Sequence, residues 1–356
     1  MKKGILFGVV CIAVLFIATF AACNSNEEPI VGNQRDTIVM SNPEFSTLLS
    51  QIENLNKSYT SMSSRSGDDG SKNGNNMSAR DSADIVQLAD DMGNMVGSGA
   101  AFAASGAVSI PGSPAAGVAL SLLLGFAMSE AGAQLFSSVA SMCIGYQIVT
   151  PKNGSGNEVR YDTNLKLEIS TSDKLEISTS DKMDLKVLQS VGKRHNLFMV
   201  KSHKKYSKYS KKELQSEKMI GVILDDCIAG LKDAYKEYGE LEYSDNFKKH
   251  LISVTMDMLQ ILDDSHTQPG MVNRFSTRMQ SLLINKYGYD EEKVLAAVKF
   301  EKLISDGCNE IDSEKIDRYS SELSKTINQS ELTTIEKANL LTGAQVAVNS
   351  RLCWAD

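Results

Sequence analysis

Acid–base chemistry at a protein site needs histidine or carboxylate side chains within hydrogen-bond reach of one another and of a substrate. The candidates here are His195, its neighbour Asn196, and the adjacent aspartates at 225–226 and 263–264. His195 falls on the apolar face of a helical pattern, which predicts an inward-pointing core histidine. Both aspartate pairs fall at the polar edge of a helical stripe, where acids are solvated. We therefore predict no catalytic residues and expect that the protein is not an enzyme.

Metal and cofactor chemistry finds no support in the spacing of the histidines. His250 and His266 are sixteen residues apart with no ligand spacing around them. The sequence contains no serine-hydrolase elbow, zinc-protease helix, phosphate loop or dinucleotide fingerprint. We predict neither a metal site nor a cofactor.

The N-terminal segment carries the clearest chemical signal. Lys2 and Lys3 are followed by an uncharged stretch over 4–22, which ends in small residues directly before Cys23. A basic head, an apolar core and a small-residue exit predict a signal peptide over 1–22 that is removed. The alternative is a retained membrane helix, because the nineteen residues of this uncharged stretch approach the ~20 that cross a bilayer.

A cysteine at the first mature position resembles the lipobox of bacterial lipoproteins, in which its sulfur carries a diacylglycerol. Phe20 stands where that motif has leucine, and Glu27-Glu28 is similar to the surface-export signal of some Gram-negative lipoproteins. The resemblance implies lipidation (palmitate) at Cys23. It also implies an outer-membrane location, with the membrane as a partner through the N-terminal lipid and with exposure at the cell surface.

Four further cysteines belong to the mature chain, and no two of them have CxxC spacing. They are Cys143, Cys227, Cys308 and Cys353. Outside the cytosol they could form two disulfides in three connectivities. They could equally be buried, small apolar thiols.

Basic residues alternate with tyrosines over 202–212. The lysines are Lys204, Lys205, Lys208, Lys211 and Lys212. Such a segment can contact an envelope anion such as a phosphorylated head group, although a solvated connection between helices explains it as well. The whole chain has a formal charge of −7, which argues against nucleic acid as a partner.

Between Asp91 and Lys152 the chain carries a single charge, Glu130, and small residues recur at every fourth position. The first run is Gly93, Gly97, Ala101, Ser105 and Ser109, and the second is Gly117, Ser121, Gly125, Ser129, Ala133 and Ser137. Four-residue spacing keeps each run on one helical face. We predict an antiparallel helical hairpin in which Gly93, Gly97, Gly117 and Gly125 allow close packing.

This hairpin is only marginally suited to a bilayer. The apolar residues over 115–135 sum to about −3 kcal/mol on insertion scales, and Glu130 offsets about the same amount. We therefore expect the hairpin to be buried against the protein's own helices. Conditional membrane insertion or self-association is the alternative.

Helical periods account for most of the remaining chain. Pro43 opens a short helix, and seven helices are predicted after residue 182. The capping box Ser210-x-x-Glu213 opens one long helix among them, and the capping box Thr333-x-x-Glu336 opens the last. The octapeptide at 167–174 is repeated at 175–182, in a region of strand-like alternation. The predicted order is a signal peptide (1–22), a tether, short helix and linker (23–80), a glycine- and alanine-rich hairpin (81–150), a loop or β-hairpin insertion (151–182) and a helical bundle (183–356).

Several of these features together resemble a group of uncharacterised bacterial lipoproteins or secreted helical proteins. They are the helix with Phe45, Ile52 and Leu55-Asn56, the acidic pair Asp90-Asp91 before the glycine-rich tract, Gly192-x-x-His195-Asn196, and the end at Ser350 to Trp354. Cys353 departs from the aromatic residue that usually precedes this tryptophan. The resemblance implies class and location only.

The sequence thus predicts an all-α, lipid-anchored cell-envelope protein with a non-enzymatic binding or structural role. The expected partner is an envelope anion or another protein, and the oligomeric state is left open. The alternative is a membrane-active or self-associating, toxin-like protein whose glycine-rich hairpin inserts in a bilayer.

Overall fold

The computed structural model describes residues 43–60, 79–103, 107–109, 118–146, 185–236, 239–265, 270–311, 315–332 and 334–350. Several predicted features lie outside these ranges: the leader, Cys23, Gly117, the octapeptide repeat, His266, and Cys353 with Trp354.

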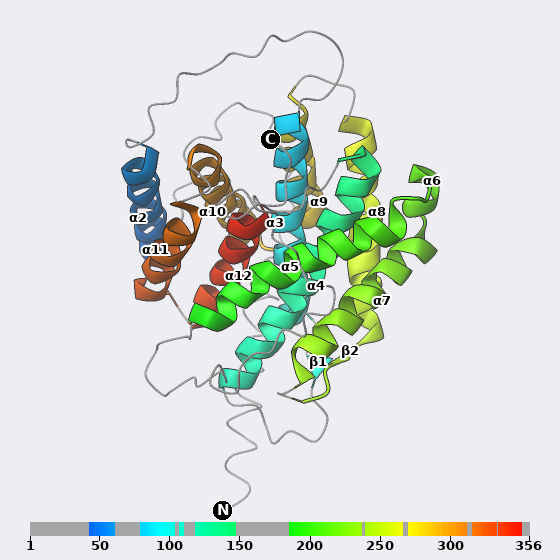
Figure 1. The fold of residues 1–356 in the computed structure, drawn as a ribbon, viewed down its shortest axis with the longest axis horizontal. Coiled ribbons are helices and arrows are strands. Elements are labelled where there is room, and N and C mark those ends of the chain that lie inside the picture. The colour runs from blue at the N-terminus through cyan, green and yellow to red at the C-terminus, as the bar shows by residue number, and fades with distance from the viewer. Residues whose placement is uncertain are drawn as a thin grey trace, which may run out of the picture. The chain divides into compact units, whose positions relative to one another are not determined.

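The described residues form an all-α fold, as predicted, with eleven helices and two very short strands (Figure 1). The helices are α2 (Pro43–Thr60), α3 (Ala79–Ala103), α4 (Val118–Ile144), α5 (Leu185–Tyr206), α6 (Lys211–Leu214), α7 (Glu217–Ala234), α8 (Asp245–Ser265), α9 (Met271–Asn285), α10 (Glu291–Glu310), α11 (Ile316–Gln329) and α12 (Thr334–Ser350). The strands are β1 (Val108–Ser109) and β2 (Glu242–Tyr243).

Helices α3 and α4 form the predicted antiparallel hairpin, and their backbones nearly touch. A Cβ atom built at Gly93 would lie 2.3 Å from the carbonyl oxygen of Gly132, and one built at Gly97 would lie 2.2 Å from that of Met128. Residue numbers rise along α3 as they fall along α4, which defines the antiparallel register. Only glycine permits this separation, because any side chain would overlap the opposite backbone.

The prediction that the first run of small residues continues on one helical face to Ser109 is wrong at its C-terminal end. Helix α3 stops at Ala103, and Ser109 lies in β1 instead of on a helix. Strand β1 pairs antiparallel with β2, with Val108 opposite Tyr243, and both of these side chains are buried. The reason is tertiary: Ser244 donates its backbone N–H to the carbonyl of Ala107 at 2.7 Å, which extends the chain there.

The predicted capping box is present, but it opens a different helix from the one expected. Ser210 accepts from the backbone N–H of Glu213 and caps α6, which ends after four residues. Ser216 then adopts extended backbone angles, and its side chain caps α7 by accepting from the N–H of Met219. Two consecutive N-caps therefore divide what the periodicity predicted as one long helix.

The remaining helices surround the hairpin. Helix α5 packs on α12 and α4, α7 and α8 pack on α4, and α10 and α11 pack on α2 (Figure 1). Helix α12 is buried at every position over 341–348, because α3, α4, α5, α10 and α11 all contact it. One apolar cluster runs through most of these helices, including Phe126, Phe136, Phe247, Phe275 and Phe300. No described helix combines the length and the apolar character that crossing a bilayer requires.

Candidate functional site

His195 lies at the centre of a polar network enclosed between helices. Its Nε2 atom is 3.0 Å from Oδ1 of Asp90 on α3, and both side chains are 0% exposed. Burial by itself disfavours the charged imidazole, but the adjacent Asp90 carboxylate outweighs this effect and raises the pKa of His195. The contact therefore joins α5 to the hairpin as a buried, charge-assisted pair.

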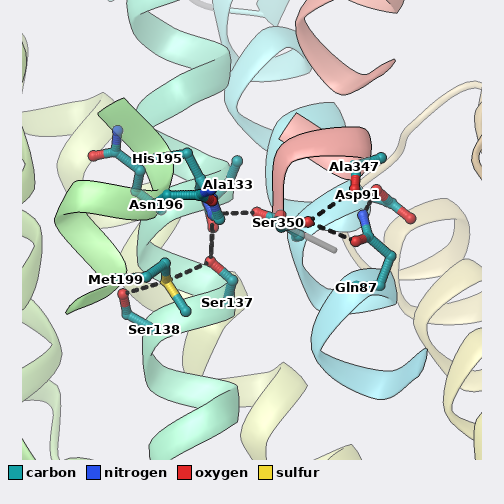
Figure 2. Close-up of polar contacts among 12 residues, drawn as sticks. Gln87, Asp91, Ala133, Ser137, Ser138, His195, Asn196, Met199, Ala347 and Ser350 are labelled. Atoms are coloured by element: carbon teal, nitrogen blue, oxygen red, sulfur yellow. Dashed lines mark hydrogen bonds and ion pairs between the residues drawn. The ribbon is translucent and has the colours of Figure 1, made fainter. Parts of the chain in front are cut away.

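Ser137 on α4 completes a group that superficially suggests a serine hydrolase. Its Oγ atom is 3.1 Å from Nε2 of His195, the same nitrogen that faces Asp90. The Ser137 hydroxyl also donates to the carbonyl oxygen of Ala133 at 2.7 Å and contacts Sδ of Met199 at 3.2 Å (Figure 2). A nucleophilic serine needs a free basic nitrogen and an open path to a substrate, and here both are lacking. Ser137 and His195 are structural.

A second part of the network connects α3 to α10 and α12. The amide nitrogen of Gln87 donates to Asp91 at 2.9 Å, and the hydroxyl of Ser350 donates to the side-chain oxygen of Gln87 at 2.7 Å (Figure 2). Burial, reinforced by the negative charge of neighbouring carboxylates, raises the pKa of Asp91 and of Glu301 well above their usual ranges. A neighbouring negative charge contributes to both pKa shifts, that of Asp90 acting on Asp91 and that of Asp91 acting on Glu301.

Glu130, the only charge in the glycine-rich tract, is neutralised inside the protein. Arg194 of α5 contacts it through two nitrogens, with Nε to Oε2 at 3.0 Å and Nη2 to Oε1 at 2.6 Å. The Tyr235 hydroxyl donates to the same carboxylate, and its ring lies 4.8 Å below the guanidinium carbon. The acid that would oppose membrane insertion is therefore a buried attachment point for α5.

A cavity of about 370 Å³ opens between α5 and α7, beside this pair but not at His195. Its apolar lining residues are Leu197, Phe198, Leu231 and Ala234. Its polar lining residues are Gln134, Arg194, Lys201, Ser202, Lys205, Asp226, Asp233 and Lys236. Its volume is within the range of small-ligand pockets, which are about 300–1,000 Å³.

The predicted basic segment is not one continuous patch. The lysines concerned are Lys204, Lys205, Lys208, Lys211 and Lys212. Lys205 pairs with Asp226 at 2.5 Å and Lys211 pairs with Asp263 at 2.6 Å, so two of the five charges are neutralised locally. Lys208 lies over the ring of Tyr209. Of the five, Lys205 alone lines the cavity, and the sequence interpretation missed Lys201 because it precedes the tyrosine-rich run.

The glycine that meets α3 most closely was also missed. Gly132 faces Gly93, whereas a Cβ built at Gly125 would come near only Asn339 Oδ1, at 4.0 Å, among the described atoms. Gly132 lies seven residues after Gly125, which is two helical turns, so a seven-residue spacing would have identified it. The predicted four-residue pattern continues after Gly125 through serine and alanine positions, and so it passes over Gly132.

The remaining histidines and cysteines form no reactive cluster in the described part of the chain. His250 contacts the Tyr289 hydroxyl at 2.8 Å, and burial lowers the pKa of His203 to about 4. Cys143, Cys227 and Cys308 are buried, and no two of them form a disulfide with each other. Burial raises the pKa of Cys143 to about 12 and so disfavours its reactive thiolate. Within the described ranges, no group of three potential ligands could hold a metal ion.

No family model, no curated protein and no solved structure matches this chain.

Proposed function

We propose that this chain is a lipid-anchored protein of the bacterial envelope with a non-enzymatic binding role. One observation carries the binding part of the proposal: the groups suited to acid–base chemistry are enclosed, while the open cavity lies elsewhere. His195, Asp90 and Ser137 are all 0% exposed. The cavity between α5 and α7 is lined by apolar side chains together with basic, acidic and uncharged polar groups, a composition suited to holding a ligand.

The location part of the proposal depends on the sequence around Cys23. The basic start, the uncharged stretch and the small residues before this cysteine support export and acylation. A lipid on Cys23 would hold the folded chain at the membrane surface, and the residues between Cys23 and Pro43 would act as a tether.

Metabolic labelling with palmitate tests this location. We expect label on the mature chain and none on a Cys23→Ser variant, with the lipidated protein in the outer-membrane fraction. Mass spectrometry that finds residues 1–22 still attached, or an unmodified thiol at Cys23, would refute lipid anchoring. Proteolysis of intact cells then tells which leaflet holds the protein.

Dye release from liposomes separates this proposal from a membrane-active role. Because Glu130 is buried against Arg194, we expect no release by micromolar mature protein. Dye release that a Gly125→Leu substitution abolishes, in a variant that remains folded, would favour insertion of the hairpin instead.

A further inference from the structure

The cavity between α5 and α7 contains a polar group without a partner. Ser202 is 3% exposed and lines the cavity, and its Oγ atom has no hydrogen-bond partner among the described residues. Burying a hydroxyl without a hydrogen bond is unfavourable, and proteins seldom keep one without a reason. An acceptor atom of a ligand inside the cavity would satisfy it.

The charges around the cavity leave one cation uncompensated. Lys205 pairs with Asp226 at 2.5 Å, and Lys236 pairs with Asp233 at 3.0 Å. Arg194 is already used by Glu130. Lys201, the residue before Ser202, is exposed and has no ion pair with any described residue.

Apolar side chains also line the cavity. Leu197 and Phe198 of α5 are half-buried, and Leu231 of α7 is part of the same lining. Gln134 of α4 contributes to the lining and is 3% exposed. A ligand that matches this lining has an apolar body and one anionic end.

We propose that this cavity binds a small amphiphile with a single carboxylate or phosphate group. The anionic group lies between the ammonium of Lys201 and the hydroxyl of Ser202, and the apolar body lies along Phe198 and Leu231. This inference rests on the proposed binding function and adds the class of ligand and the residues that select it.

Calorimetric titration of the mature chain carrying Cys23→Ser tests the proposal with octanoate and octyl phosphate as probes. We expect at least one probe to bind with submillimolar affinity. Three control compounds should bind at least tenfold more weakly. Octyltrimethylammonium has the same tail and the opposite charge, and acetate and inorganic phosphate have no tail. Equal binding of the cationic amphiphile or of the tailless anions would overturn the proposal, as would the failure of both probes to bind.

Substitutions locate the binding in the cavity. Lys201→Met and Ser202→Ala should each weaken binding at least fivefold, whereas Lys204→Met, an exposed control on the same helix, should not. Gly230→Leu should block the cavity without unfolding the protein, because no described atom lies within 4 Å of a Cβ built there. Ala229→Leu, on the exposed face of α7 and outside the lining, is its matched control.

Two outcomes keep this inference separable from the proposed function. If the natural chain takes up no palmitate but the protein still binds octanoate or octyl phosphate, the proposed location is refuted and the cavity assignment stands. The protein could instead bind phosphatidylglycerol vesicles equally well with and without Gly230→Leu, and bind neither free probe. That result would show that exposed lysines attract the vesicle surface, and it would overturn the cavity assignment.

Discussion

At the scale of single residues, the protein places an unusual number of acids in its interior. Asp90, Asp91, Glu130 and Glu301 are all buried, yet Arg194 and His195 are their only basic partners among the described residues. Together with burial, this excess of acid raises the pKa of Asp91 and of Glu301. A buried polar network of this kind favours one arrangement of helices, because other packings would leave charges unpaired.

Replacing Glu301 with glutamine should stabilise the protein at neutral pH. The pKa of Glu301 is raised above its ordinary value of 4.5, so the folded state retains a proton that the unfolded state loses. The free energy of unfolding of the natural protein therefore falls as the pH rises from 4.5 towards the folded pKa. Glu301→Gln removes this loss, and urea titrations should show a gain of about 1–3 kcal/mol at pH 8 and almost none at pH 4.

Glu331 is an exposed glutamate and provides the control for this pH dependence. Glu331→Gln should leave the pH profile of unfolding unchanged. A Glu301→Gln variant with the same profile as the natural protein would mean that Glu301 is charged in the folded state.

Removing either partner of the buried Glu130–Arg194 pair should be strongly destabilising. Glu130→Ala leaves the guanidinium of Arg194 buried without its carboxylate, and a loss of about 3–5 kcal/mol in unfolding free energy is expected. The double variant with Arg194→Ala should lose less than the sum of the two single losses. Additive losses in denaturant titrations would show that the pair is not coupled.

At the scale of the helices, close backbone contact defines the hairpin. A Cβ at Gly132 would lie 1.9 Å from the carbonyl oxygen of Gly93, so α3 and α4 can approach only where both positions are glycine. The same hairpin supplies Asp90, Asp91, Glu130 and Ser137, so its register positions the buried network.

Gly132→Ala and Gly93→Ala should therefore push the helices apart and cost at least about 2 kcal/mol each. Gly125 lies on α4, as Gly132 does, but a Cβ there meets only the tip of Asn339 at 4.0 Å. Gly125→Ala should therefore be neutral or stabilising by up to ~1 kcal/mol. Thermal unfolding of the three variants measures the difference. Equal effects at Gly132 and Gly125 would contradict the observed register.

At the scale of the whole molecule, most charges that the sequence displays as clusters are paired across helices. Asp225 pairs with Lys248, Asp263 with Lys211, and Asp264 with Arg278. Such exposed pairs contribute little stability individually, about 0–1 kcal/mol. Their consequence is that neither the adjacent aspartates nor the lysine run forms a reactive or strongly charged surface. None of these three pairs lines the cavity between α5 and α7.

The sequence by itself determined the helical class, the hairpin and the inward direction of His195, because these follow from the local spacing of apolar and small residues. It missed the end of the helix before Ser216. The apolar spacing continues through this residue as in one helix, but the Ser216 side chain caps the N-terminus of a new helix, α7. The sequence also missed Gly132, which meets α3 most closely, and Lys201, which lines the cavity. Only the tertiary structure decided which acids meet which bases and where a cavity remains, because these depend on distances between helices that no local pattern encodes.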